Sequence, residues 1–134
     1  MTKSNQKSRG KTNEGEIKIA VIEEVADNIY SIKFILQSIG YEVASFSSHD
    51  AYQLSVKEFL PHLIIVDMMI VGGAGFAVIS ELHKGSLKKV PILAITAEAM
   101  EGKEEDVYKA GGQDALCKPY TVKDLKKKLK KWLT

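Results

Sequence analysis

The stretch HLIIVDMMIVGGAGF, residues 62 to 76, runs four apolar residues into Asp67 and then loosens into glycines. Apolar side chains at every position of LIIV fit a short strand that is buried on both faces of a sheet. The carboxyl end of such a strand is where a parallel sheet opens to water, so a charged residue can follow the buried run there. We therefore interpret residues 62 to 66 as a central strand with Asp67 at its carboxyl end.

Short apolar runs of this kind alternate with helical patterns along the chain from Ile17 onward. Strands that alternate with helices favour a parallel sheet whose right-handed crossover helices cover both faces. The sequence therefore predicts an α/β fold, a doubly wound five-stranded parallel sheet with five helices. The expected strands are residues 17–22, 41–46, 62–66, 91–95 and 114–117, and the expected helices are residues 27–39, 50–59, 75–84, 102–110 and 122–133.

Glycine and threonine residues mark several of the expected helix ends. Gly40 follows the first helix and Gly111 follows the fourth, at positions where glycine commonly ends a helix. Thr121 precedes the last helix, where a hydroxyl can cap the first turn. These residues support the predicted boundaries.

Length and composition fit one globular domain. The chain has 134 residues, of which 45% are hydrophobic, enough for a sizeable core. Residues 1 to 16 are polar and lack apolar periodicity, so we expect a flexible leader or linker there and one domain over residues 17 to 134. Cys117 is the single cysteine, which excludes an intrachain disulfide and fits a reducing compartment. No apolar run approaches the roughly 20 residues that cross a bilayer, and the N-terminus lacks the apolar core of a signal peptide, so we expect a cytoplasmic protein without membrane insertion.

Positive charge is concentrated in the last predicted helix, VKDLKKKLKKWL. Six lysines lie within residues 121 to 134 against one acidic residue, Asp124. Leucines and Trp132 recur at helical spacing, so we expect one face to pack on the sheet and the lysines to face water. A local positive field of this kind favours an acidic protein partner. Nucleic acid is not expected as a partner, because no recognition motif or interleaved exposed aromatic residue accompanies the lysines.

Five polar side chains fall at the carboxyl ends of the predicted strands, where open parallel sheets bind ligands. They are Glu23, Glu24, Asp67, Thr96 and Lys118. Clustered carboxylates repel one another unless a hard cation lies among them, and oxygen ligands favour Mg2+. An aspartate carboxylate can attack phosphorus while a cation and a lysine neutralise the growing negative charge and a hydroxyl donates to a phosphoryl oxygen. The set therefore predicts a phosphoryl-handling site, with Asp67 as acceptor and Lys118 and Thr96 in the supporting roles.

The motifs VIEE, LIIVD, LAITAEAM and CKPY, taken at these successive strand ends, resemble the receiver domain of two-component response regulators over about residues 17 to 133. The resemblance implies a flavodoxin-like sheet with strand order 2-1-3-4-5. It also implies a bound Mg2+ or Mn2+ ion, held by side chains and one backbone carbonyl. These ligands would be Glu23, Glu24, Asp67 and, through its carbonyl, Met69. Pro119 matches the proline after the family's phosphate-pairing lysine, and the peptide bond before that proline is often cis in the family.

The same resemblance implies a role in two-component signalling or a phosphorelay. Asp67 would take a phosphoryl group from a sensor histidine kinase or a phosphotransfer protein, and slow hydrolysis would then remove it. The signal would pass to a protein partner through the face formed by residues 102 to 133. We expect a signalling protein rather than an enzyme with turnover, in a stand-alone receiver domain whose output runs through a partner, a phosphorelay or a longer chain from which this segment was cut.

Three features depart from the family pattern. The second member of the acidic pair is usually aspartate, and the longer Glu24 moves the carboxylate by roughly 1.5 Å, which matters because Mg2+ demands near-ideal geometry. After the acceptor the family usually has a Met-Pro pair, whereas Val71 stands in place of that proline and glycines follow, which enlarges the conformational freedom of the loop. Ala115 replaces the Tyr or Phe whose ring turns inward as the threonine moves. We therefore expect output through movement of the Thr96 loop and the fourth helix.

Other interpretations of the chain stay open. A pseudo-receiver, which keeps the fold as a binding module and is not phosphorylated, is favoured by the same three departures. An aspartyl-phosphate hydrolase of the haloacid dehalogenase type would need a second aspartate two residues after the nucleophile, where Met69 stands. Flavodoxin-like cofactor binding is disfavoured, because residues 21–28, VIEEVADN, offer carboxylates where a flavin phosphate needs hydroxyls and glycines.

Overall fold

The computed structural model describes residues 16–48, 52–70, 73–97, 102 and 104–133, and these form a parallel five-stranded sheet with the strand order β2-β1-β3-β4-β5. The strands are β1 (Lys18–Ile22), β2 (Glu42–Phe46), β3 (Leu63–Asp67), β4 (Ile92–Thr96) and β5 (Asp114–Cys117). The helices are α1 (Ala26–Ile39), α2 (Tyr52–Phe59), α3 (Gly75–Leu82), α4 (Glu104–Ala110) and α5 (Val122–Leu133), with a short 3-10 turn, η3 (Gly85–Leu87), after α3. The predicted fold class and strand order are confirmed.

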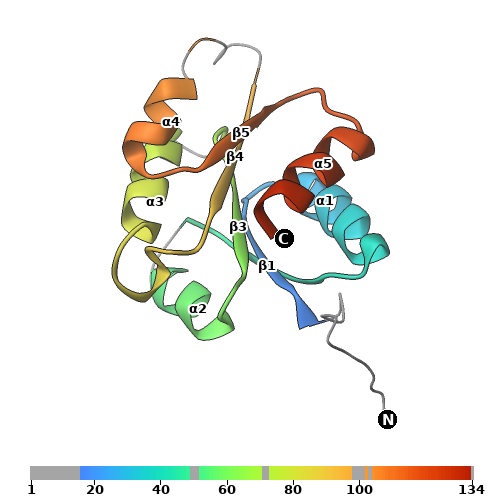
Figure 1. Ribbon diagram of the computed structural model, residues 1–134, viewed down its shortest axis with the longest axis horizontal. Helices are drawn as coiled ribbons and strands as arrows, with labels where there is room; N and C mark the ends of the chain where they lie inside the picture. Colours follow the sequence, from blue (N-terminus) through green and yellow to red (C-terminus); the bar gives the residue numbers. More distant parts are fainter. Residues whose placement is uncertain (1–15, 49–51, 71–72, 98–101, 103, 134) are drawn as a thin grey trace.

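The sheet separates two layers of helices, as Figure 1 shows: α1 and α5 cover one face, and α2, α3 and α4 cover the other. Side chains along each strand alternate between the two layers, because successive residues of a strand point to opposite faces. In β1, Ile19 and Val21 join the core beneath α1 and α5, while Ala20 and Ile22 join the core beneath α2, α3 and α4. All residues of β3 are buried, so the strand that ends in Asp67 is held from both sides.

Two of the predicted site residues are the last residues of central strands. β3 ends at Asp67 and β4 ends at Thr96, and their exposed fractions are only 5% and 3%. In the register, Asp67 lies opposite Ile95 and Thr96 lies opposite Cys117. The ends of β3, β4 and β5 therefore meet at one edge of the sheet, where parallel α/β folds bind their ligands.

Helix boundaries follow the predicted caps. Gly40 ends α1 with a φ of 117°, and Gly111, directly after α4, has a φ of 116°. At the start of α5, the Thr121 hydroxyl accepts the Asp124 N–H at 3.0 Å, and the Asp124 carboxylate accepts the Thr121 N–H at 3.0 Å. This reciprocal capping box begins the basic helix at the predicted residue.

Helix α5 is anchored on the sheet by a buried carboxylate that the sequence did not reveal. Asp114, at the start of β5, accepts hydrogen bonds from Trp132 Nε1 at 2.8 Å and from Lys128 Nζ at 2.9 Å. Lys131 Nζ lies 3.6 Å from the same carboxylate. The expectation that the lysines of this helix face water is therefore wrong for Lys128, which points to the sheet because an unpaired buried carboxylate would be costly.

The predicted leader, residues 1 to 16, lies outside the described residues apart from Glu16. Across the part of the chain that the structure does describe, the helices are too short or too polar for any of them to cross a membrane.

Candidate functional site

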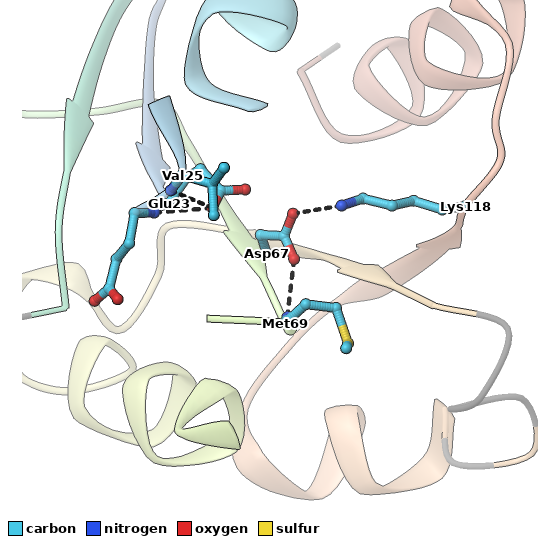
Figure 2. A network of polar contacts seen from close by, with 6 residues as sticks. Glu23, Val25, Asp67, Met69 and Lys118 are labelled. Atoms are coloured by element: carbon cyan, nitrogen blue, oxygen red, sulfur yellow. Dashed lines mark hydrogen bonds and ion pairs between the residues drawn. The ribbon is translucent and has the colours of Figure 1, made fainter. Parts of the chain in front are cut away.

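Asp67 is the centre of a group of polar contacts at the carboxyl edge of the sheet (Figure 2). Lys118 Nζ donates to Asp67 Oδ2 at 2.8 Å, and the Met69 N–H donates to Asp67 Oδ1 at 2.8 Å. The side chain of Asp67 is 8% exposed and that of Lys118 is 36% exposed. Each carboxylate oxygen thus has a donor, while the lysine keeps contact with solvent.

Lys118 is brought to this edge by the backbone ladder between β4 and β5. Its N–H donates to the Thr96 carbonyl at 2.8 Å, one residue beyond the end of β5. The Lys118–Pro119 peptide bond is cis, as the resemblance implied. The structure therefore brings Asp67 and Lys118 together, as predicted from their places at strand ends.

Glu23 lies between Asp67 and the start of α1. Its Oε2 accepts the N–H groups of Glu24 at 2.9 Å and Val25 at 3.0 Å, donors that have no partner within the helix that follows. Its own N–H donates to the Phe46 carbonyl at 3.0 Å, which extends the β1–β2 ladder. Its carboxyl group contacts that of Asp67, so the first member of the acidic pair is in the site as predicted.

Burial and the contact between the two carboxyl groups both act on their pKa values, which shift in opposite directions. Burial and the hydrogen bond with Asp67 raise the pKa of Glu23 above its usual range, and the N–H groups of Val25 and Glu24 offset this only in part. Burial also acts to raise the pKa of Asp67, but hydrogen bonds with Glu23, Lys118 and the Met69 N–H outweigh burial and leave that pKa below its ordinary value. Two carboxyl groups in contact do not readily ionise together. The opposite shifts make Asp67 the more readily ionised of the two groups, and an ionised carboxylate is the form that a nucleophile needs.

Glu24, the second member of the acidic pair, is directed toward β2. Its Oε2 accepts the Ser48 N–H at 3.1 Å and also the Ser48 hydroxyl. Ser48 follows β2 and Asp67 ends β3, and these two strands flank β1, the strand that precedes Glu24, on opposite sides. The structure therefore brings Glu23, but not the Glu24 carboxylate, against Asp67.

The remaining predicted residues lie at the same edge. Thr96 is buried at the end of β4, the neighbour of β3. Met69 is the second residue after Asp67, and its backbone N–H donates to the Asp67 carboxylate, while the residue as a whole is 56% exposed. A metal contact through its carbonyl stays a prediction. Residues 71–72 of the divergent loop and residues 98–101 of the Thr96 loop lie outside the described residues.

The donor set at this edge fits a hard divalent cation through two carboxyl groups. Mg2+ keeps several waters and commonly takes one or two carboxylates, and Glu23 and Asp67 offer these in direct contact. Within the described part of the chain, no group of three or more His, Cys, Asp or Glu side chains is arranged to hold a metal ion. Glu23 and Asp67 are therefore the candidate carboxylate ligands, with a cation in place of the proton of their hydrogen bond, whereas Glu24 would have to leave Ser48.

Several residues around the site escaped sequence reasoning. A cavity of about 80 Å³ lies beside Asp67, and Asn28 and Ser31 of α1 and Tyr120 after β5 are among its lining residues. Asn28 and Ser31 stand three residues apart, the spacing that places two side chains on one face of a helix. That spacing was the available signal for a polar stripe facing the site.

Comparisons with known proteins agree with this fold. Residues 19–130 match the family model of the response regulator receiver domain. The phosphate regulon transcriptional regulatory protein PhoB of Escherichia coli strain K12 is 29% identical over 117 residues, which cover 84% of this chain and 50% of that protein, so the chain spans about half the length of this relative. The polar-differentiation response regulator DivK of Brucella ovis is 27% identical over 117 residues, which cover 86% of this chain and 94% of that protein.

Solved structures show the same likeness. The receiver domain of a sensor histidine kinase from Pseudomonas aeruginosa, crystallised with a magnesium ion coordinated in its active site cleft, is 27% identical with a TM-score of 0.77 over 87% of this chain and 97% of that one. A chemotaxis response regulator of Vibrio cholerae is 24% identical with a TM-score of 0.77 over 87% and 98% of the two chains, which bears on the fold alone. Since the family model spans most of the sequence, the predicted resemblance is confirmed, and the chain belongs to the family of response regulator receiver domains.

Proposed function

We propose that Asp67 of this receiver domain accepts a phosphoryl group from a phosphohistidine of a sensor histidine kinase or a phosphotransfer protein. The observation that carries the proposal is the buried Asp67 carboxylate, held by Lys118 at 2.8 Å at the carboxyl edge of a parallel sheet. The low pKa of Asp67 keeps this carboxylate ionised at neutral pH, so it can act as the nucleophile without a separate base.

The chemistry follows from the atoms in place. An Asp67 oxygen forms a bond to phosphorus while the bond from phosphorus to the histidine nitrogen breaks, and the electron pair of that bond stays on the imidazole. Lys118 neutralises negative charge on the phosphoryl oxygens, and Thr96 supplies a hydroxyl donor from the end of β4. Attack of water on phosphorus later releases inorganic phosphate and restores the carboxylate. The domain therefore stores a signal rather than turning over a substrate.

A divalent cation, Mg2+ or Mn2+, belongs to this proposal. Glu23 and Asp67 would hold it with the Met69 carbonyl, and Glu24 would join them once its carboxylate is released from Ser48. When bound, the ion supplies positive charge to the phosphoryl oxygens during transfer. The neighbouring structure from Pseudomonas aeruginosa, with its magnesium ion in the active site cleft, supports this cofactor.

The downstream partner would dock on the face formed by α4, β5 and α5. Exposed lysines crowd α5, and their positive field favours an acidic protein surface. They are Lys123, Lys126, Lys127, Lys130 and Lys131. Such a partner is consistent with the predicted cytoplasmic location of the domain.

A pseudo-receiver is the second candidate function, and one observation favours it. The Glu24 carboxylate is occupied by Ser48, so one of the three predicted carboxylate ligands is turned from the cation site. In that case the domain would bind its partner through the same face without being phosphorylated.

Exposure of the protein to Mg2+ and a small phosphodonor such as acetyl phosphate separates the two candidates. We expect the intact mass to rise by one HPO3 group, and we expect Asp67→Asn to abolish the gain. Asp106→Asn, on the exposed surface of α4, is the matched control and should gain the group as the wild type does. A wild-type mass that stays unchanged with acetyl phosphate, phosphoramidate and a histidine kinase alike would leave the pseudo-receiver as the function.

A further inference from the structure

The register of the sheet places Glu24 beside Ser48. β1 and β2 are parallel, with Ile22 opposite Phe46, and the Glu23 N–H continues the ladder to the Phe46 carbonyl at 3.0 Å. Glu24 lies two residues after Ile22, and Ser48 lies two residues after Phe46. Their proximity is therefore built into the pairing of the strands.

Ser48 provides two donors to a single oxygen of Glu24. The Ser48 N–H lies 3.1 Å from Glu24 Oε2, and the Ser48 hydroxyl donates to the same atom. Hydrogen bonds to an ionised carboxylate are shorter and roughly twice as strong as bonds between neutral groups. Both residues are partly buried, so water competes only weakly for these positions. Two donors from one residue thus fix the direction of the carboxylate.

We propose that Ser48 is a positioning residue that holds the Glu24 carboxylate away from the Asp67 edge, so that a divalent cation has to compete with Ser48 for Glu24. The inference rests on the proposed function, because it concerns the cation of that site. Ser48 follows β2 and Asp67 ends β3, and these strands flank β1 on opposite sides, so the Glu24 oxygen that accepts from Ser48 is directed away from β3. Cation binding through Glu24 must therefore break the two hydrogen bonds that Ser48 donates.

The length of the side chain at position 24 agrees with this role. Glutamate carries its carboxylate roughly 1.5 Å farther from the backbone than aspartate does, about one C–C bond. The extra length reaches the end of the neighbouring strand, where both Ser48 donors are met. Glu24, which stands in place of the usual aspartate, and Ser48 therefore act together, and their hydrogen bonds lower the affinity of the site for its cation.

Calorimetric titration of the full chain with MgCl2 tests the inference. Ser48→Ala keeps the backbone donor and removes the hydroxyl, so it should bind Mg2+ about fivefold more tightly than the wild type. Ser48→Thr keeps a hydroxyl and should restore the wild-type affinity. Ser55→Ala, on the exposed side of α2, is the matched control and should also match the wild type. An affinity of Ser48→Ala equal to or weaker than that of the wild type would overturn the inference.

A measurement on the unmodified protein covers the case in which a Ser48 variant does not fold. In an NMR titration with MgCl2, the Ser48 amide proton should shift upfield at saturation because it loses a carboxylate acceptor. A Ser48 amide that stays in place at saturating Mg2+ overturns the inference.

The outcomes separate this inference from the proposed function. If the wild type binds Mg2+ and is phosphorylated while the Ser48 readouts stay unchanged, the inference fails and the function stands. If Ser48→Ala gains affinity but Asp67 takes no phosphoryl group, the inference stands and the function fails. If neither the wild type nor Ser48→Ala binds Mg2+, the proposed competition between Ser48 and the cation for Glu24 is overturned as well.

Discussion

Replacement of Asp114 by asparagine should lower the free energy of unfolding by about 2–3 kcal/mol. The carboxylate is 7% exposed and accepts hydrogen bonds from Trp132 Nε1 at 2.8 Å, Lys128 Nζ at 2.9 Å and the Ala115 N–H at 2.8 Å. Asparagine has the same shape but one acceptor oxygen, so one buried donor would face an amide N–H, which costs roughly 1.5–3 kcal/mol. The Lys128 side chain is 31% exposed, so the loss of its ion pair adds less than about 1 kcal/mol.

The size of this loss should depend on pH. Burial acts to raise the pKa of Asp114, but the hydrogen bonds from Trp132, Lys128 and the Ala115 N–H outweigh it, so the folded state holds the pKa below its ordinary value. A lowered pKa stabilises the folded protein fully above the unfolded value, about 3.9 for aspartate. That stabilisation disappears as the pH falls through the folded value. The difference between wild type and Asp114→Asn should be constant near neutral pH and shrink below about pH 4.

Urea unfolding followed by far-UV circular dichroism measures both effects by linear extrapolation. At roughly 4 °C per kcal/mol for a domain of this size, the melting temperature of Asp114→Asn should also fall by about 10 °C. Asp106→Asn, exposed on α4, is the control and should unfold as the wild type does. The reasoning is refuted if Asp114→Asn loses no more stability than the control, or if its deficit stays undiminished in acid.

Two further substitutions have expected effects of known sign. Gly111→Ala should destabilise the domain by about 2 kcal/mol or more in urea unfolding, because Gly111 has a φ of 116° and an added Cβ would lie 2.6 Å from His83 Cγ. The control is Gly85→Ala, which should cost only about 1–2 kcal/mol, because Gly85 has a φ of 57° but open space where the Cβ would lie. Equal losses of stability in the two variants would contradict the steric argument. Lys118→Gln should raise the pKa of Asp67 and slow its phosphorylation by acetyl phosphate. In a plot of the phosphorylation rate against pH, the fall in rate on the acidic side should therefore move to higher pH. An unchanged acidic side would show that Lys118 does not lower the pKa of Asp67.

The fold could be predicted because its signal is local and repeated. Each strand is a short apolar run, and the runs in β3 and β4 are buried at every residue, as the sequence LIIVD and ILAIT suggests. The predicted strand boundaries differ from the observed ones by at most one residue, for example residues 62–66 against Leu63–Asp67. The order of the strands did not come from periodicity, and only the family resemblance supplied it.

The pairing of side chains between distant elements could not be predicted in the same way. In the sequence, Asp114 is an ordinary polar residue at the start of a predicted strand, and Trp132 is expected to pack on the sheet with the leucines of its helix. Their hydrogen bond joins residues 18 apart and depends on how α5 crosses β5, which no local pattern encodes. The lysines of α5 looked equivalent in sequence for the same reason, although Lys128 alone donates a hydrogen bond to the buried carboxylate among those described.

The acidic pair shows most clearly where sequence reasoning stops. Positions at the ends of strands locate Glu23 and Glu24 at the correct edge, because the carboxyl ends of parallel strands meet there. The sequence does not tell which partner each of these adjacent carboxylates meets, because the partners follow strands on either side of β1. The β1–β2 ladder continues through the Glu23 N–H, and this pairing sets Glu24 beside Ser48. One carboxyl group therefore reaches Asp67 and the other reaches Ser48, and the second can join the cation only by giving up two hydrogen bonds. Cation binding by this domain would then depend on Ser48, a residue beyond the end of the neighbouring strand, as well as on the residues of the family motif.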